Sequence, residues 1–176
     1  MVTTTEPALA EKIRSLRVHG SLRRYYHDEI GCNSRLDALQ AGVLEVKLQY
    51  LDQWTRKRQE NAKVYEKLLK EVNLKEFVQT PSSLSENVHV YNQYVVRVKR
   101  RDDLRAFLAQ KEIGTEVYYP VPLHLQKCYE FLGHKKGDFP ESEKASLETM
   151  ALPIYPELTS DQLQFVAESI KKFYIG

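Results

Sequence analysis

Apolar residues recur at helical spacing through the middle of the first half of the chain. From residue 35 to about residue 72 there is no proline, and Gly42 is the one glycine. The apolar positions follow each other at intervals of three, four and seven, at Leu36, Leu39, Val43, Val46, Tyr50, Ala62, Tyr65 and Leu69. This pattern predicts one long helix, or two helices in line with a kink near residues 52–54, closed by the stop signal Pro81.

The first twenty residues follow a different pattern. Residues 2–4 are strand-like, and a lone short strand needs a sheet to pair with, so we expect the last strand of a larger sheet. Thr5 can cap a following helix that has Pro7 in its first turn. One face of that helix is marked by Leu9, Ile13 and Leu16.

The period changes from helix to strand after Pro81. Valines alternate with polar residues in "NVHVYNQYVVRVK", which predicts a strand over residues 88–98. Asp102 or Asp103 can cap the next helix, and Gly114 can end it. Further strands are expected at residues 115–119 and 151–155.

Helices are expected between and after these strands. A short one is predicted around "LQKCYEF", another from Pro140 to about Met150, and a last one that Thr159 and Gln162 open as a capping box. The order β-α-β-α-β-α predicts an α+β fold, in which a long helix or helix pair precedes a small sheet covered by helices. The boundary between the two parts is expected near residues 73–87.

Composition excludes several classes of protein. The chain of 176 residues is 42% hydrophobic and 28% charged, with a net charge of +2, which argues against a nucleic-acid-binding protein. Its apolar runs are too short to span a membrane, and no signal peptide opens it. Two cysteines cannot make a disulfide framework or a zinc site. We therefore expect a reduced, cytoplasmic protein.

Two polar clusters stand out as candidate sites. Residues 19–35, "HGSLRRYYHDEIGCNSR", combine arginines, tyrosines, histidines and an asparagine, which suits an anion; a solvated basic loop explains the composition equally well. Residues 117–124, "VYYPVPLH", form a rigid aromatic surface with polar tips, or ordinary turns with half-buried tyrosines. Asn33 is notable because a helix starting near Leu36 would direct its positive end towards it and favour a phosphate there.

Three segments resemble a known family. "GCNSRLDALQAGVLEVKLQYLDQWTRKRQENAKVYEKLL" resembles the Gly-x-Asn-x-Arg-Leu-x-x-x-Gln-Ala segment of the DegT/DnrJ/EryC1/StrS nucleotide-sugar aminotransferases. "GTEVYYPVPLHLQ" and "ALPIYPELT" resemble later landmarks of that family, in the same order. Members are pyridoxal-phosphate (PLP) enzymes that transfer an amino group, usually from glutamate, to a keto-sugar attached to a nucleotide, for surface-polysaccharide and related amino-sugar pathways.

The resemblance implies the C-terminal part of a fold-type I PLP enzyme. Residues 1–34 would be a remnant of the large cofactor-binding domain, 35–81 a connecting helical region, and 82–176 the small α+β domain. Members are about twice as long, and their Schiff-base lysine lies before the segment matched here. Lysines such as Lys12 and Lys47 match nothing catalytic. The resemblance therefore implies no catalytic residue in this chain, and we expect the chain alone to be inactive and to bind no cofactor.

The resemblance also implies roles for individual residues. Asn33 matches the asparagine that reaches the cofactor phosphate of the partner subunit in a homodimer with shared active sites. Substrate-facing positions are implied at His19, Arg23, Tyr26, Arg35, Tyr118, Tyr119 and His124, and Tyr118 stands where many relatives have histidine. Implied ligands are glutamate and a nucleotide sugar, with no metal, nucleic acid or membrane. Two alternatives remain: a sugar dehydratase of the same family, in which histidine replaces the upstream lysine, and a non-catalytic module that binds a partner.

Overall fold

A computed structural model describes residues 2–71 and 73–176. The chain divides into two compact units, one ending at Tyr50 and one from Leu51 to Gly176. The boundaries at residues 34 and 81 implied by the family resemblance remain predictions. Each unit is described by itself below.

The first unit contains two helices and a long loop between them. Helix α1 spans Pro7–Leu16, with the expected proline in its first turn. Its N-cap is Glu6, which makes no side-chain cap, so the prediction of Thr5 as the cap is wrong. Residues 2–4 form no strand among the described residues. Helix α2 spans Ala38–Leu48 and has no buried residue.

The long helical pattern of the sequence forms two helices. Helix α3 spans Leu51–Glu71, so the break lies at Gln49 and Tyr50, just before the predicted kink at residues 52–54. Ala62, Tyr65 and Leu69 are the buried residues of α3. Their spacing of three and four places them on one face, as the sequence predicts. The apolar positions before Tyr50 are exposed instead, and α2 has no buried residue.

The sheet has three antiparallel strands in the order β1-β2-β3. They are β1 at Val78–Gln79, β2 at Tyr94–Val98 and β3 at Thr149–Leu152. Val78 pairs with Val98, and Tyr94 pairs with Leu152, so β2 lies in the middle. β1 is a strand that the sequence did not predict.

The predicted strand boundaries are corrected at three places. The strand expected at residues 88–98 begins only at Tyr94, because Tyr91 adopts a left-handed conformation with φ of 47° and breaks the extended chain. Of residues 115–119 only Glu116 pairs, with Ala151. The strand predicted at residues 151–155 begins at Thr149 and ends before Pro153, which has no N–H to donate to a ladder.

The helices of the second unit also differ in detail from prediction. Helix α4, Arg101–Ala109, is preceded by the left-handed N-cap Arg100 instead of an aspartate cap, and Asp102 and Asp103 lie in its first turn. The helix ends well before Gly114, and Glu112 takes the left-handed conformation near its end, with φ of 59°.

The remaining helices follow the second cluster and the last strand. The predicted helix around "LQKCYEF" is two 3₁₀ segments, η1 at Leu123–Leu125 and η2 at Lys127–Leu132. Helix α5 spans Pro140–Glu148, so Met150 belongs to β3 and not to this helix. Helix α6, Ser160–Tyr174, opens with the predicted capping box of Thr159 and Gln162.

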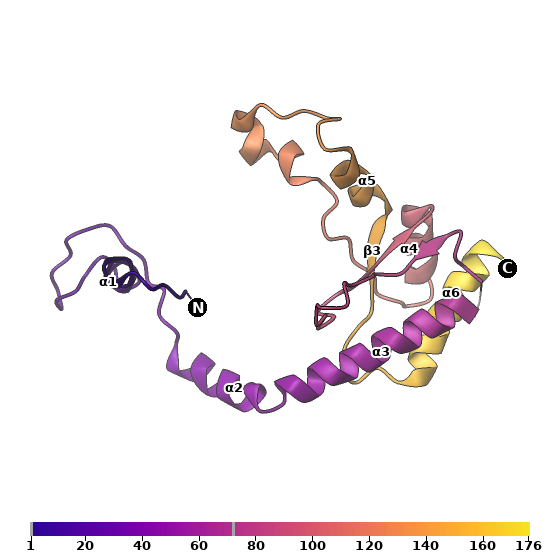
Figure 1. The fold of residues 1–176 in the computed structure, drawn as a ribbon, viewed down its shortest axis with the longest axis horizontal. Coiled ribbons are helices and arrows are strands. Elements are labelled where there is room, and N and C mark those ends of the chain that lie inside the picture. Colours follow the sequence, from indigo (N-terminus) through magenta and orange to yellow (C-terminus); the bar gives the residue numbers. More distant parts are fainter. Residues whose placement is uncertain (1, 72) are drawn as a thin grey trace. The chain divides into compact units, whose positions relative to one another are not determined.

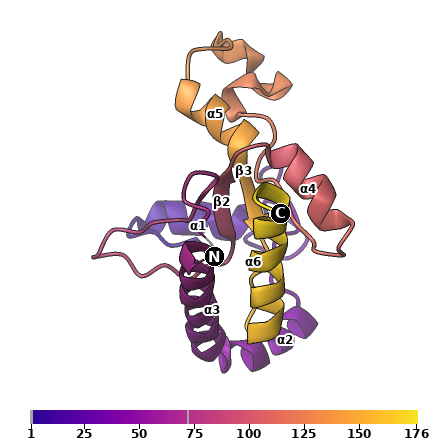
Figure 2. The same cartoon turned by 90° about the vertical axis from the view of Figure 1, so that its right-hand side faces the viewer.

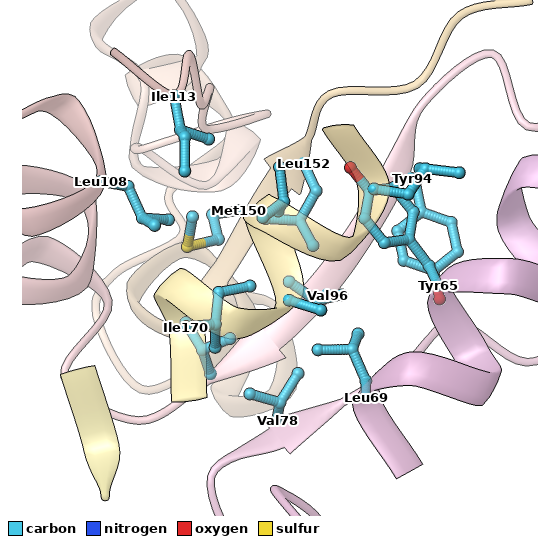
Figure 3. Close-up of a cluster of buried hydrophobic side chains, with 14 of the residues drawn as sticks. Tyr65, Leu69, Val78, Tyr94, Val96, Leu108, Ile113, Met150, Leu152 and Ile170 are labelled. Carbon is cyan, nitrogen blue, oxygen red and sulfur yellow. The ribbon is translucent and has the colours of Figure 1, made fainter. Parts of the chain in front are cut away.

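One face of the sheet carries the hydrophobic core of the second unit. Helices α3 and α6 pack side by side (Figures 1 and 2), and α4 packs on α6. Figure 3 shows Leu69 of α3, Val96 of β2 and Ile170 of α6 converging in this core. The helical and strand residues that meet here are buried almost completely, so hydrophobic burial is the main stabilising contribution.

Hydrogen bonds tie helix α3 to the segment that follows β3. The Tyr65 hydroxyl donates to the Pro153 carbonyl at 3.0 Å, and the Asn61 amide donates to the Tyr155 carbonyl at 2.8 Å. The Tyr65 ring also lies 5.1 Å from the ring of Tyr94. These contacts fix the chain that leaves β3 against α3.

Candidate functional site

The first candidate cluster is a loop closed by backbone pairing at its base. The Cys32 N–H donates to the Leu16 carbonyl at 2.8 Å, and the His19 N–H donates to the Cys32 carbonyl at 3.1 Å. Val18 and Asn33 form a β-bridge at the same place. We call residues 15–20 and 29–34 the neck of this loop. Because the neck pairs backbone to backbone, both ends of the loop are held in place.

Two glycines make this neck possible. A Cβ on Gly31 would lie 2.3 Å from the Gly20 nitrogen and 2.5 Å from the Leu16 carbonyl oxygen. A Cβ on Gly20 would lie 1.9 Å from the Glu29 carbonyl oxygen, and Gly20 has a φ of 71°. Only glycine fits at these two positions, because a side chain would push the facing backbone away.

Side chains near the neck add polar contacts. The Lys12 ammonium of α1 pairs with the Glu29 carboxylate and lowers the pKa of Glu29 below its ordinary value. The His27 ring nitrogen Nδ1 bonds the His19 carbonyl at 3.0 Å. His19 itself has a left-handed φ of 66°. His19 therefore contributes its backbone to the loop structure, while its side chain is exposed at the surface.

The tip of the loop presents arginines stacked on tyrosines. The Arg23 guanidinium carbon lies 4.3 Å from the centre of the Tyr26 ring, and that of Arg24 lies 4.9 Å from the centre of the Tyr25 ring. A backbone bond from the Tyr26 N–H to the Arg23 carbonyl, 2.9 Å, closes the turn. A guanidinium that stacks on a ring uses its face for that contact. Its N–H groups lie at its edge and can still bind an anion.

Asn33 and Arg35 lie together at the end of the loop. The Arg35 Nε–H donates to the Asn33 Oδ1 at 3.1 Å. This bond fixes the orientation of the Asn33 amide, so that its Nδ2 remains a donor for another group. The helix that follows starts at Ala38, close to the predicted start near Leu36, and the Asp37 side chain caps it by accepting the Leu39 N–H at 2.9 Å. The Asp37 side chain therefore satisfies one of the free N–H groups at the start of α2.

The second candidate cluster surrounds Tyr118, which forms part of two hollows. The larger hollow has a volume of about 380 Å³, and its lining is Asn92, Gln93, Gly114, Thr115, Glu116, Tyr118, Ala151, Leu152, Pro153 and Ile154. The smaller one, about 200 Å³, is lined by both Tyr118 and Tyr119, by residues 121–123, and by Ser142, Ala145, Ser146 and Thr149. Both tyrosine rings are partly exposed.

His124 lies apart from these hollows, in a buried pair with Glu143. The His124 Nε2–H donates to the Glu143 Oε1 at 3.0 Å, and the Gly137 N–H donates to the same oxygen at 2.7 Å. The His124 ring also packs on Phe139, with ring centres 4.8 Å apart. The backbone bond from Gly137, with His124 as a further contributor, lowers the pKa of Glu143. No pattern in the sequence pointed to Glu143.

A buried arginine bonds two residues that line the smaller hollow. The Arg101 side chain at the start of α4 donates to the Ser146 carbonyl at 3.0 Å and to the Thr149 carbonyl at 3.0 Å. It also pairs with the Asp102 carboxylate at 2.6 Å. These bonds hold the end of α5 and the start of β3 together, and Ser146 and Thr149 line the smaller hollow.

Metal and membrane sites are not found in the part of the chain that the structure describes. No group of three or more His, Cys, Asp or Glu side chains at residues 2–71 and 73–176 could hold a metal ion. None of the helices over the same residues is long and apolar enough to cross a bilayer. Both cysteines, Cys32 and Cys128, are free thiols at the surface.

Comparison with known proteins assigns the family. The profile of the DegT/DnrJ/EryC1/StrS aminotransferase family matches residues 1–171. The chain therefore belongs to this family, as its three sequence segments indicate. Its α+β fold agrees with this assignment.

The relatives are about twice as long as this chain. It is 48% identical, over 99% of its length and 46% of the relative's, to a "Pleiotropic regulatory protein" of Geobacillus stearothermophilus. It is 36% identical, over 98% of its length and 46% of the relative's, to the dTDP-3-amino-3,6-dideoxy-alpha-D-galactopyranose transaminase of Aneurinibacillus thermoaerophilus. The chain thus spans about half the length of the curated relatives it matches.

Solved structures of other proteins also superpose on this chain. The DesV protein of S. venezuelae, determined in complex with a ketimine intermediate, superposes with a TM-score of 0.87 at 34% identity, over 99% of this chain and 46% of that one. NtdA of Bacillus subtilis, determined with bound cofactor PMP, superposes with a TM-score of 0.79 at 28% identity, over 97% of this chain and 41% of that one.

Proposed function

We propose that this chain forms part of a PLP-dependent aminotransferase that moves an amino group from glutamate to a keto-sugar linked to a nucleotide. The observation that carries the proposal is the loop with its glycine neck, which presents Asn33 and Arg35 in a chain of the aminotransferase family. Both side chains are donors, and donors are what a phosphate requires.

The Asn33 side chain fits a cofactor phosphate. Its Oδ1 already accepts from Arg35, so the group it offers outward is the Nδ2 amide donor. The cofactor, when bound, supplies the electron sink through which an amino group is exchanged. Asn33 would hold the phosphate of that cofactor, and Arg35 would hold Asn33 in the orientation that permits this. The neck would keep Asn33 rigid.

The other candidate residues would bind substrate. The stacked pair of Arg23 and Tyr26 offers guanidinium donors to the diphosphate of a nucleotide sugar. His19, Tyr118 and Tyr119 would contribute further substrate contacts. His124, whose Nε2 is bonded to Glu143, would act by holding η1 and the wall of the smaller hollow in place.

The residues that bind the cofactor ring would come from outside this chain. Lys12 of α1 is paired with Glu29 of the loop, and Lys47 lies in the last turn of α2. We therefore propose that the chain alone binds no cofactor and is inactive. The complete enzyme would be a homodimer with shared active sites, located in the cytoplasm.

The test uses the full-length enzyme that carries these residues. It is incubated with PLP, glutamate and dTDP- or UDP-linked keto-sugars, and the products are identified by mass spectrometry. Formation of a nucleotide-linked amino sugar together with 2-oxoglutarate supports the proposal. A deoxygenated sugar without added nitrogen would instead identify a dehydratase. The chain of 176 residues, assayed in parallel, is expected to form neither product.

A further inference from the structure

A buried hydrogen bond ties the segment with the second candidate cluster to the rest of its unit. We call residues 118–133, which include η1 and η2, the arm. In the described part of the chain, the His124 Nε2–H donates to the Glu143 Oε1 at 3.0 Å, and the arm's other hydrogen bonds close turns within the arm. Figures 1 and 2 show that the arm projects from the second unit near α5.

Burial of the arm is concentrated at this bond. The side chains of His124 and Glu143 are 8% and 16% exposed. All residues of the arm are described by the structure, and none of them belongs to the hydrophobic core. A segment that makes few buried contacts opens locally at a small cost in free energy. The arm is therefore held in place mainly through His124.

Glu143 belongs to a helix that is itself firmly held. The Ser146 hydroxyl donates to the Glu143 carbonyl at 2.7 Å, and the buried Arg101 of α4 donates to the Ser146 carbonyl at 3.0 Å. The Gly137 N–H donates, at 2.7 Å, to the same Glu143 Oε1 that accepts from His124. One carboxylate oxygen therefore joins the arm, the loop before α5 and α5 itself.

The bond also joins the two segments that line the smaller hollow. Leu123 lines this hollow from the arm and directly precedes His124, and Ser142 lines it from α5 and directly precedes Glu143. Both tyrosines of the second candidate cluster line it as well. If the bond is lost, the arm can shift relative to α5 and carry these side chains with it. A shift of about 1 Å is enough to impair a group that must meet a substrate.

We propose that Glu143 is a positioning residue that holds the arm, and with it Tyr118 and Tyr119, in the position that binds the nucleotide-sugar substrate. This inference rests on the proposed function for the identity of the substrate. Glu143 would act through His124 without touching the substrate, because its Oε1 accepts two N–H groups of the protein and its side chain is largely buried. Binding groups need such supporting residues to keep their geometry.

The experiment measures the binding of substrate and of cofactor separately in the full-length enzyme. Dissociation constants of UDP-glucose and dTDP-glucose are measured by calorimetry without turnover, and that of PLP is measured by absorbance. His124→Phe removes the N–H donor but keeps a ring against Phe139. We expect it to weaken nucleotide-sugar binding by about three- to tenfold, the effect of one hydrogen bond, and to leave PLP affinity unchanged. General damage to the fold would weaken the binding of both ligands.

Variants of Glu143 test the bond itself. Glu143→Ala removes the acceptor, and adding His124→Phe to it should weaken nucleotide-sugar binding no further, because both changes remove the same bond. Glu143→Gln keeps an oxygen that can accept both N–H groups. We expect its affinity for the nucleotide sugar to stay within about twofold of that of wild type.

His134→Phe is the matched control. His134 also packs on Phe139, with ring centres 5.0 Å apart, and it also pairs with a carboxylate, that of Asp138 at 3.6 Å. It lies outside the arm, and its neighbours Gly133 and Lys135 are not among the residues that line the smaller hollow. We expect this variant to bind both ligands as wild type does.

The proposal is overturned if His124→Phe changes nucleotide-sugar affinity by less than about twofold, if it weakens PLP binding equally, if His134→Phe has the same effect, or if neither nucleotide sugar binds. A loss of affinity in His124→Phe, in an enzyme that forms no amino sugar, would support the positioning role and refute the proposed transamination. Amino-sugar formation together with wild-type nucleotide-sugar affinity in His124→Phe would support the transamination and refute the positioning role.

Discussion

Gly20 and Gly31 approach each other so closely that a Cβ on Gly31 would lie 2.3 Å from the Gly20 nitrogen. The neighbours of that Cβ are backbone atoms, which cannot move aside as a flexible side chain can. We expect Gly31→Ala to destabilise the loop by about 1–3 kcal/mol, the usual cost of overpacking. Hydrogen exchange of the Cys32 and Ser34 amides, which close the neck, would measure the loss.

Gly42 provides the control for this substitution. It lies in α2, where a Cβ would meet nothing within 4 Å. Gly42→Ala should stabilise the helix by about 0.5–1 kcal/mol, because alanine loses less backbone freedom on folding. If the neck amides were equally protected in wild type and in Gly31→Ala, a Cβ at residue 31 would not destabilise the neck.

Asn33→Ala should weaken cofactor retention in the full-length enzyme. The substitution removes the Nδ2 donor that we assign to the phosphate, and a hydrogen bond to a charged group is worth roughly 1.5–3 kcal/mol. The affinity should therefore fall about tenfold or more. Titration of PLP followed by absorbance measures it. Ser34→Ala is the neighbouring control, and an unchanged affinity in Asn33→Ala would remove Asn33 from the site.

Glu143 should make the stability of the second unit depend on pH. Its pKa is lowered in the folded state, so its contribution is complete above the ordinary value of 4.5 and is lost as the pH falls through the lowered value. Glu143→Gln should lower the melting temperature at pH 7, and the difference from wild type should shrink below pH 4.5. Thermal melts across this range test the sign, and a difference that grows on acidification would refute it.

Removal of the Tyr65 hydroxyl and removal of the Tyr94 hydroxyl should change the free energy of unfolding differently. Burial raises the pKa of both side chains, so both stay neutral. The Tyr65 hydroxyl donates to Pro153, whereas that of Tyr94 is buried without a partner among the described residues. Tyr65→Phe should cost about 0.5–1.5 kcal/mol, and Tyr94→Phe should be neutral or stabilising. Denaturant unfolding measures both, and equal losses would show that the bond to Pro153 contributes nothing specific.

Periodicity and capping predicted the elements whose causes are local. The buried face of α3 follows from the spacing of Ala62, Tyr65 and Leu69, and the start of α6 follows from the capping box at Thr159. Both depend on residues within a few positions of each other along the chain, so the sequence displays them directly.

Features set by distant contacts or by unusual backbone were missed. Val88 and Val90 alternate like a strand but stay exposed, because the left-handed Tyr91 separates them from β2. Arg100 and Glu112 take conformations that the sequence rules assign to glycine. At the candidate site, Glu143 is invisible in the sequence because its partners His124 and Gly137 lie in other segments.

The bonds from α3 to the segment after β3 have a consequence for how the second unit folds. The contact between Tyr65 and Pro153 spans 88 residues of chain, and that between Asn61 and Tyr155 spans 94. Closing loops of this length costs entropy before any native contact repays it, and such topologies fold slowly. The hydrogen bonds of helix α3 are local, so this helix can form early. We expect the rate-limiting step of folding to be the formation of the contacts between α3 and the segment after β3.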